Sequence, residues 1–325
     1  MEQEMLNQRT DLTQLSTAVE QIRQTLGKII VGQKDVIDLL IAGLLADGHL
    51  LLEGVPGVAK TLSAKLMAKC ISASFSRIQF TPDLMPSDVL GTAVFSPKTA
   101  EFQFRHGPIF GNIILVDEIN RAPAKTQSAL FEAMEERQIT VDGSTYKLEE
   151  PFMVLATQNP VDQEGTYRLP EAQLDRFLFK IEVKYPSLED EIQILVNQHQ
   201  QKSDDQLLEI EAVLSVEQVK ALRSTIKALF VEPKLLAYAA QITHETRNNK
   251  SLYLGASPRA SLAMVNGAKA IAAMAGRDFV TPDDIIKVAA PVLAHRVMLS
   301  PEKEMEGLTP ADIIAQIIKK IEIPR

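Results

Sequence analysis

Short apolar runs alternate with other segments through the first half of the chain. The apolar runs are His49–Glu53, Phe75–Phe80, Ile113–Asp117, Phe152–Thr157 and Phe177–Val183. Helix-like segments, such as 60–72 and 124–136, lie between most of these runs. Continuous apolar runs of this length are typical of strands that are buried on both faces of a parallel sheet. The pattern therefore predicts an α/β domain in which helices cover a parallel sheet.

Two intervals replace this rhythm with a period of two. Residues 91–106 alternate apolar and polar positions around Ser96-Pro97-Lys98, and residues 138–149 do so around Asp142-Gly143. Such alternation predicts strands with one exposed face, and Asp-Gly is a strong signal for a tight two-residue turn. Both intervals are therefore predicted to be β-hairpins inserted into the α/β domain.

After Pro186 the apolar spacing becomes helical and remains so. Signals for helix N-caps occur at Ser215, Thr281 and Thr309, and proline follows each of the two threonines. Residues 198–212 are polar and acidic, which predicts a linker. We therefore expect an α/β domain over residues 1–185 and an all-helical domain over residues 186–325.

Composition and charge narrow the class of protein. The 325 residues include 34 Lys and Arg against 42 Asp and Glu, a formal charge of −8 that argues against nucleic acid as the main partner. The single cysteine excludes a disulfide framework and a cysteine-based zinc cluster, and it fits a reducing compartment. No signal peptide is visible, and the longest apolar run, Leu39–Ala46, is too short for a membrane helix. We therefore expect a soluble cytoplasmic protein without a membrane segment.

The first apolar run leads directly into the loop GVPGVAKT, residues 54–61. A phosphate loop needs backbone N–H groups that point inward, a helix N-terminus, a lysine for the β- and γ-phosphates and a hydroxyl for Mg²⁺. Lys60 and Thr61 supply the last two, whereas Ala59 stands where the usual pattern has glycine. An ordinary strand–turn–helix with a surface lysine is the simpler interpretation, but the flanking strand and helix favour nucleotide binding. The predicted binding residues are Gly54, Val55, Pro56, Gly57, Val58, Ala59, Lys60, Thr61 and Leu62.

The third apolar run ends in two carboxylates, Asp117 and Glu118. Beside a phosphate loop, Asp117 is expected to hold Mg²⁺, commonly through water, and Glu118 to orient or deprotonate the attacking water. A solvated acidic strand end would explain the pair in isolation, but the phosphate loop on the same sheet makes the pair more specific. The amide of Asn159, after the next run, could hold that water, although Asn-Pro alone more often marks a turn. Together these residues predict hydrolysis of a nucleoside triphosphate, with Thr61 and Asp117 as metal ligands.

Two arginines lie where the local structure does not call for them. Arg259 follows Ser257-Pro258 in the first turn of a predicted helix, where an exposed cation opposes the helix dipole by about 0.3–1 kcal/mol. A phosphate partner would explain Arg259, and a solvent-exposed arginine is the alternative. Arg176 precedes the last apolar run, and from the local sequence alone a salt bridge to Asp175 or another neighbour is the better interpretation.

Longer strings of the chain resemble the MoxR family of AAA+ ATPases. They are GVPGVAKT, LVDEINRAPAKTQSALFEAMEERQIT, ATQNPVDQEGTYRLPEAQLDRF and GASPRA, and the resemblance covers roughly residues 11–325. It implies a P-loop NTPase αβα sandwich with a parallel sheet, two inserted β-hairpins and an all-helical lid, with ATP and Mg²⁺ bound between the domains. The family also looks as though it tolerates alanine at the position of Ala59.

The same resemblance implies roles for individual residues. It assigns Lys60 and Thr61 to Walker A, Asp117 and Glu118 to Walker B, Asn159 to sensor 1, Arg176 to the arginine finger and Arg259 to sensor 2. It places adenine against Val31, Gly32 and Gln33, and a polar switch residue, Gln79, near the catalytic glutamate. Arg121 belongs to the family strings but receives no role.

The resemblance also implies a function and an assembly. Relatives look like ATP hydrolases that form rings, most often hexamers, in which Arg176 would act on the nucleotide of a neighbouring subunit. They look like chaperones that remodel or activate partner proteins, frequently metalloenzymes, and their usual companions contain von Willebrand factor A domains. A magnesium-chelatase-type motor subunit is the first alternative, and a minichromosome-maintenance-type helicase is the second.

The inserted hairpins bear on these alternatives. A helicase predicts basic hairpins, but 91–106 carries Lys98, Arg105 and His106 against Glu101, and 138–149 carries Lys147 against Asp142 and Glu149. This is too little positive charge to follow a phosphate backbone. Phe102 and Phe104 lie two residues apart, so in a strand they share one face. That face either packs on the domain or, with Tyr146, lines a pore and grips protein; the sequence leaves both interpretations open.

Overall fold

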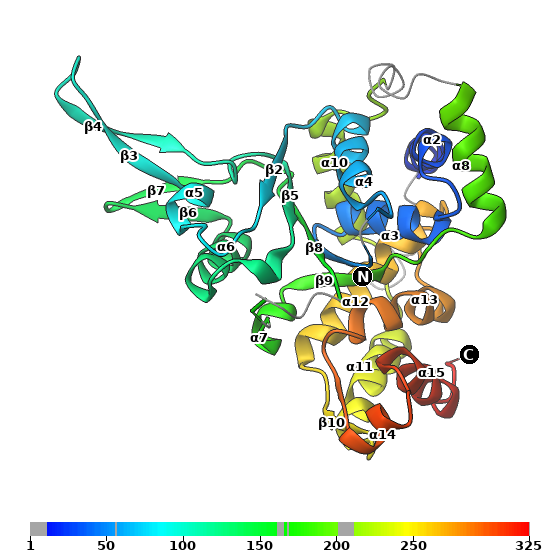
Figure 1. The fold of residues 1–325 in the computed structure, drawn as a ribbon. Helices are drawn as coiled ribbons and strands as arrows, with labels where there is room; N and C mark the ends of the chain where they lie inside the picture. Colours follow the sequence, from blue (N-terminus) through cyan, green and yellow to red (C-terminus); the bar gives the residue numbers. More distant parts are fainter. Residues whose placement is uncertain (1–11, 56, 161–165, 168, 201–210, 325) are drawn as a thin grey trace, which may run out of the picture.

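The five apolar runs form one parallel sheet at the centre of the molecule (Figure 1). Its strands are β1 (His49–Glu53), β2 (Phe75–Gln79), β5 (Ile113–Asp117), β8 (Met153–Gln158) and β9 (Phe177–Glu182), in the order β2-β5-β8-β1-β9. All neighbouring strands are parallel, which confirms the predicted fold class. Since parallel strands carry their carboxyl ends at one edge, the loops that follow β1, β5 and β8 meet there.

The structure is a computed structural model that describes residues 12–55, 57–160, 166–167, 169–200 and 211–324. The helices of the first half are α2 (Thr13–Ile29), α3 (Lys34–Leu45), α4 (Lys60–Cys70), α5 (Pro86–Leu90), the 3-10 turn η1 (Ile119–Arg121), α6 (Ala124–Glu136) and α7 (Glu171–Leu174). Those of the second half are α8 (Leu188–Gln200), α10 (Val216–Lys227), α11 (Pro233–Asn248), α12 (Pro258–Met274), α13 (Pro282–Leu293), α14 (Pro301–Met305) and α15 (Pro310–Lys320). Across these described segments, no helix is long and apolar enough to cross a membrane.

Successive residues of each strand contribute to opposite faces of the sheet, which gives the sandwich two cores. Leu50, Leu52, Leu115 and Leu155 are buried in the core that contains α2, α3, α4 and the lid helices. Leu51, Ile114, Val116 and Val154 are buried in the second core, against α6. Strands covered on both faces explain why the sequence shows continuous apolar runs instead of alternation.

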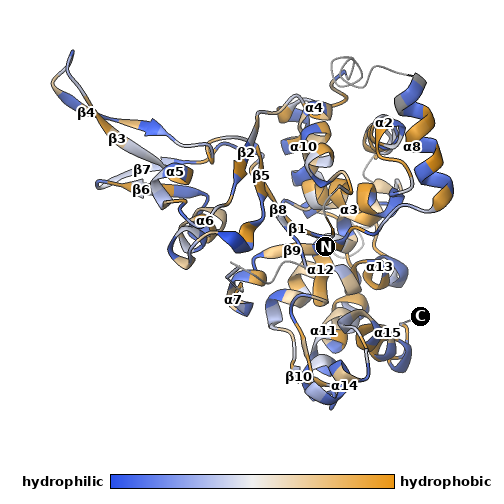
Figure 2. Cartoon of the chain, viewed as in Figure 1, coloured by the Kyte–Doolittle hydropathy of each residue, from blue (hydrophilic) through white to orange (hydrophobic). Residues whose placement is uncertain are grey.

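The helical lid packs against the edge strand β9. Gly267 of α12 approaches the Phe179 ring so closely that a Cβ there would lie 2.9 Å from the ring. Figure 2 shows hydrophobic residues gathered where α12 meets β9. The lid is therefore seated on the sheet by apolar packing, close to the end of α7.

Two details of the C-terminal half differ from the sequence prediction. The lid is not purely helical, because β10 (Leu252–Leu254) and β11 (Met298–Leu299) form a short antiparallel pair. Strands of two or three residues are too short to show a period of two, so the sequence carries no signal for them. The predicted linker 198–212 begins as the last residues of α8, and its residues 201–210 lie outside the described segments.

Both inserted hairpins are present. β3 (Gly91–Ser96) pairs with β4 (Glu101–His106), and β6 (Gln138–Val141) pairs with β7 (Ser144–Lys147), both antiparallel. The turn between β6 and β7 has φ of 49° at Asp142 and 78° at Gly143, the left-handed values that such tight turns require. The two hairpins extend from the same side of the α/β domain (Figure 1), and the rings of Phe104 and Tyr146 stack between them at 4.4 Å.

Candidate nucleotide-binding site

A cavity of about 390 Å³ opens at the carboxyl edge of the sheet. It is lined by Gly57, Ala59, Lys60, Thr61, Leu62, Arg77, Gln79, Asp117, Glu118, Thr157 and Asn159. Most of the residues predicted for phosphate, metal and water binding therefore lie around one cavity. They come from the loop after β1 and from the ends of β2, β5 and β8.

The phosphate loop is held in a defined conformation at the start of α4. Ala59 has φ of 60° and ψ of 19°, a left-handed conformation that costs alanine free energy and that glycine adopts freely. Gly57 also has a positive φ, 87°, and nothing lies within 4 Å of where its Cβ would be. The loop thus needs left-handed residues at both positions, and only one of them is glycine.

The Lys60 ammonium lies folded against its own loop. Its Nζ donates a hydrogen bond to the carbonyl oxygen of Gly54. Burial lowers the pKa of Lys60, and the carboxylates of Asp117 and Glu118 oppose this shift. The ammonium therefore faces both predicted Walker B acids, which is where a phosphate chain would have to pass.

Asp117 is almost fully buried at the end of β5 and is surrounded by donors. Its Oδ1 accepts a hydrogen bond from Thr157 Oγ1 at 3.1 Å. Its Oδ2 accepts from Arg77 Nε at 2.7 Å and lies 3.5 Å from Thr61 Oγ1. The carboxylate and the Thr61 hydroxyl are thus adjacent, as a shared cation would require.

Glu118 has an unusual backbone conformation, with φ of 57° and ψ of 52°. Its N–H donates to Thr157 Oγ1 at 3.0 Å, which fixes the turn. Its Oε2 accepts from Gln79 Nε2 at 2.9 Å and lies 3.0 Å from Arg121 Nε. Gln79 therefore contacts the glutamate as predicted, and Arg121, for which the sequence suggested no role, forms an ion pair with it.

The other predicted nucleotide-binding residues lie outside this cavity lining. A Cβ on Gly54 would lie 2.5 Å from the carbonyl oxygen of Val183. Glycine is therefore required where the segment after β1 approaches the segment after β9. Val58 is buried in the core and Val55 packs against it. Gly32, with φ of 77°, lies against the Asp190 carboxylate of α8, so the predicted adenine segment with Val31 and Gln33 sits beside the first turn of that helix. Pro56 lies outside the described residues.

Arg176 and Arg259 do not line the cavity, but they share one ion-pair partner. Both guanidinium groups form ion pairs with the carboxylate of Glu135 on α6, that of Arg259 at 2.7 Å. Arg176 Nη1 also donates to the Phe131 carbonyl at 3.0 Å. Burial and the nearby Arg259 charge lower the pKa of Arg176. The predicted salt bridge between Arg176 and Asp175 is absent from the described contacts, because Asp175 binds Arg296.

Comparisons with known proteins match this architecture. Family models for the ATPase family associated with various cellular activities (AAA) and for the AAA lid domain match residues 49–179 and 244–317. YeaC of Bacillus subtilis is 47% identical over 95% of both chains, and Chaperone MoxR1 of Mycobacterium tuberculosis is 42% identical over 92% of this chain and 80% of its own. A crystal structure of a protein from Cytophaga hutchinsonii assigned as an ATPase has a TM-score of 0.87, with 42% identity and coverage of 95% of this chain and 96% of that one. The chain belongs to the MoxR family of AAA+ ATPases.

Two polar residues of this MoxR-family cavity were not anticipated from the sequence. Arg77 lies two residues before Gln79 on β2, so both side chains fall on the same side of the strand. Thr157 ends an apolar run and binds both Walker B residues. The sequence did offer one signal for Arg77 and Thr157. Each is a polar residue near the carboxyl end of a predicted strand, at the edge of the sheet where the loops meet.

Proposed function

We propose that this chain is a Mg²⁺-dependent ATP hydrolase. The observation that carries the proposal is the single cavity around which Lys60, Thr61, Asp117, Glu118 and Asn159 are gathered. A lysine at a helix start suits the β- and γ-phosphates, and the acids suit a metal and an attacking water. These groups follow β1, β5 and β8, which are neighbouring strands of the sheet.

The donor set fits Mg²⁺. Asp117 Oδ2 and Thr61 Oγ1 lie 3.5 Å apart and are hard oxygen ligands of the kind that Mg²⁺ prefers. When bound there, the ion would neutralise charge on the β- and γ-phosphate oxygens. Asp117 would hold it, commonly through water, and Thr157 would keep the Asp117 carboxylate oriented through the contact to Oδ1.

Glu118 is the proposed base. Its carboxylate lies at the cavity wall and is held by Gln79 and Arg121 through one oxygen, Oε2. The second oxygen, Oε1, would then accept the proton of the attacking water. Asn159, which follows β8 and lines the same cavity, would orient that water toward the γ-phosphate.

Arg176 and Arg259 are proposed to act on the nucleotide of a neighbouring subunit in a ring, most simply a hexamer. Neither lines its own chain's cavity, and both converge on Glu135. A pair of cations presented in this way can stabilise the charge that develops on a transferred phosphoryl group. The nearby carboxylate keeps the two cations together until a phosphate replaces it.

Hydrolysis is proposed to drive the remodelling or activation of partner proteins. The two hairpins extend from the α/β domain and present the Phe102 side chain, which is 74% exposed. By analogy with Chaperone MoxR1, the client would be a protein, with a metalloenzyme or a von Willebrand factor A domain protein as the specific expectation. Moving the lid relative to the sheet would move the hairpins and do work on a bound chain.

Turnover measured with two variants tests the catalytic assignment. Lys60→Ala should abolish ATP hydrolysis, whereas Glu118→Gln should bind ATP and Mg²⁺ and hydrolyse poorly, because Glu118 acts on water. Lys65→Ala, on the exposed side of α4, is the matched control for Lys60 and should retain turnover. Undiminished hydrolysis by Lys60→Ala would remove the basis of the proposal.

A further inference from the structure

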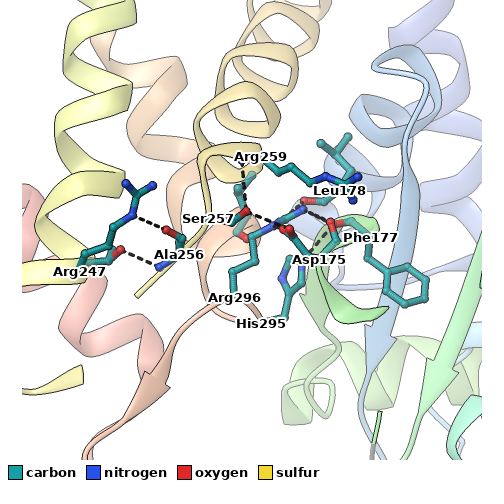
Figure 3. Close-up of polar contacts among 11 residues, drawn as sticks. Asp175, Phe177, Leu178, Arg247, Ala256, Ser257, Arg259, His295 and Arg296 are labelled. Atoms are coloured by element: carbon teal, nitrogen blue, oxygen red, sulfur yellow. Dashed lines mark hydrogen bonds and ion pairs between the residues drawn. The ribbon is translucent and has the colours of Figure 1, made fainter. Parts of the chain in front are cut away.

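Asp175, the residue before Arg176, binds two elements of the lid (Figure 3). Its Oδ1 accepts a hydrogen bond from Arg296 Nε at 2.6 Å, and its Oδ2 accepts one from Ser257 Oγ at 2.9 Å. Ser257 is the N-cap of α12, and Arg296 follows α13. One carboxylate therefore joins the segment that carries Arg176 to two helices of the lid.

Arg296 also holds the backbone of this segment. Its Nη2 donates to the carbonyl oxygens of Asp175 at 2.9 Å and Phe177 at 2.6 Å, and its Nη1 donates to that of Leu178 at 3.2 Å. The side chains of Arg296 and Asp175 are only 3% and 16% exposed. Burial lowers the pKa of Arg296, and the Asp175 carboxylate counteracts this shift. A buried ion pair with this many directional contacts fixes the start of β9 against the lid.

The contacts continue from Ser257 to the second arginine. Ser257 Oγ, which donates to Asp175, also accepts the Arg259 N–H at 3.2 Å. The Arg259 side chain binds Glu135 at 2.7 Å, and Arg176 binds the other oxygen of the same carboxylate. Asp175, Arg176, Glu135, Arg259 and Ser257 therefore form a closed loop of contacts. The loop links the backbone that carries Arg176 to the backbone that carries Arg259, and it brings both guanidinium groups to one carboxylate.

We propose that Asp175 is a positioning residue that sets the separation of Arg176 and Arg259, so that both guanidinium groups meet the phosphates of one neighbouring nucleotide together. This inference rests on the proposed role of the two arginines between subunits. The two guanidinium groups share one carboxylate and repel each other; burial lowers the pKa of Arg176 most, and the Arg259 charge lowers it further. Glu135 offsets that repulsion when no phosphate is bound. Asp175 fixes the backbone at Arg176 directly and the backbone at Arg259 through Ser257. Preorganisation of this kind lowers the cost of binding charge in the transition state.

Ser257→Ala is the variant that isolates this role. Replacing Asp175 itself would leave Arg296 buried without its counter-charge, which endangers folding. Ser257→Ala removes the contact from Asp175 Oδ2 to the lid and leaves the Arg296 pair in place. It also removes a helix cap, so Ser215→Ala, which uncaps α10, is the matched control. Ser257→Thr retains a hydroxyl and is the conservative variant.

The experiment mixes two kinds of subunit, each inactive alone. Acceptor subunits carry Arg176→Ala and an intact nucleotide cavity; donor subunits carry Lys60→Ala and intact arginines. The donor should restore ATP hydrolysis at mixed interfaces, and adding Ser257→Ala to the donor should lower the restored kcat roughly 10- to 100-fold. The KM for ATP should stay within twofold, because it belongs to the acceptor's own cavity. Donors that carry Ser215→Ala or Ser257→Thr should restore kcat fully.

The outcomes separate the inference from the function on which it rests. Equal rescue by donors with and without Ser257→Ala would overturn the positioning role of Asp175 and leave catalysis between subunits standing. A raised KM at unchanged kcat would also overturn it, because the link would then serve nucleotide binding. Absence of any rescue by the Lys60→Ala donor, with mixed rings verified by native mass spectrometry, would overturn the action of Arg176 between subunits and this inference with it.

Discussion

The guanidinium of Arg77 forms an ion pair with the Asp117 carboxylate, with Nε and Oδ2 2.7 Å apart. The Thr61 hydroxyl lies 3.5 Å from the same Asp117 oxygen. In this arrangement Arg77 occupies the side of Asp117 that a metal ion shared with Thr61 would use. The Arg77 side chain is 53% exposed and that of Asp117 only 9%, so Arg77 can move into solvent when a metal ion takes its place beside the buried carboxylate.

Arg77→Met should therefore make the cavity easier for Mg²⁺ to enter. Because Arg77 is 53% exposed, we use the value for ion pairs open to solvent, roughly 0.2–1 kcal/mol. The Mg²⁺ concentration that half-saturates ADP binding should then fall by about 1.4- to 5-fold. Calorimetric titration of ADP at several Mg²⁺ concentrations measures this shift. Lys180→Met, which breaks the pair between Lys180 and Glu53 on neighbouring strands, is the matched control and should leave the Mg²⁺ requirement unchanged. A Mg²⁺ requirement that rises in Arg77→Met would mean that Arg77 assists metal binding.

Ala59→Gly should stabilise the protein. The residue has φ of 60°, which is unfavourable for alanine. We expect the free energy of unfolding in urea to rise by about 0.5–1 kcal/mol, once the greater entropy of glycine in the unfolded chain is subtracted. ATP hydrolysis should be retained, since glycine supports the same loop. The matched control is Ala221→Gly on the exposed face of α10, where φ is helical and a loss of about 0.5–1 kcal/mol is expected. Destabilisation by both substitutions would show that the loop at Ala59 is not strained.

The sequence predicts those features that depend on neighbouring residues. The bounds of β1 and β5 follow directly from apolar runs, and the turn at Asp142-Gly143 follows from its residue types. The grouping of Lys60 with Asp117 and Glu118 was expected from the sequence because the phosphate loop and the acid pair follow strands of the same sheet.

Features that depend on the packing of distant segments were not predictable in this way. Glu135 on α6 binds Arg176 and Arg259, which lie 41 and 124 residues further along the chain. The partner of Asp175 lies 121 residues along the chain, at Arg296. No periodicity or spacing signals such a contact, because it is fixed only when the lid is seated on β9.

The burial of His49 predicts that the free energy of unfolding falls in acid. It is buried in β1, where its Nδ1 accepts the Val154 N–H at 2.9 Å and its Nε2 lies 3.1 Å from the Met134 carbonyl. Burial, with the nearby charges of Arg137 and Arg223, lowers the pKa of His49 to about 3. Because the unfolded state binds a proton near pH 6.5 and the folded state does not, the free energy of unfolding must fall as the pH falls below about 6.5.

Between pH 7 and pH 5 the contribution of His49 to this loss should be roughly 2 kcal/mol. Urea unfolding of the wild type and of His49→Gln at both pH values measures it, since the difference between the two proteins cancels the shared carboxylates. His244→Gln, an exposed histidine on α11, is the control and should keep the full wild-type dependence. An unchanged pH dependence in His49→Gln would mean that His49 is not the group responsible.

Replacing the exposed aromatic residue of the hairpin should weaken the action on a client protein without lowering the free energy of unfolding. Phe102 is 74% exposed, and its only described ring contact is an edge-to-face contact with Phe95 at 5.5 Å, whereas Phe104 stacks on Tyr146 at 4.4 Å. Phe102→Ala should therefore change the free energy of unfolding by less than about 0.5 kcal/mol, as for other exposed positions. Phe80→Ala, in the buried core, should by contrast cost about 3–5 kcal/mol.

If Phe102 grips protein, its loss should weaken the stimulation of ATP hydrolysis by a permanently unfolded protein such as reduced, carboxymethylated α-lactalbumin. Tyr146→Ala should do the same at a cost in stability, because it removes the stacked ring. Full stimulation in a stably folded Phe102→Ala protein would exclude this residue from the client-binding surface, and with it the mechanism in which the exposed hairpin face pulls on a bound chain.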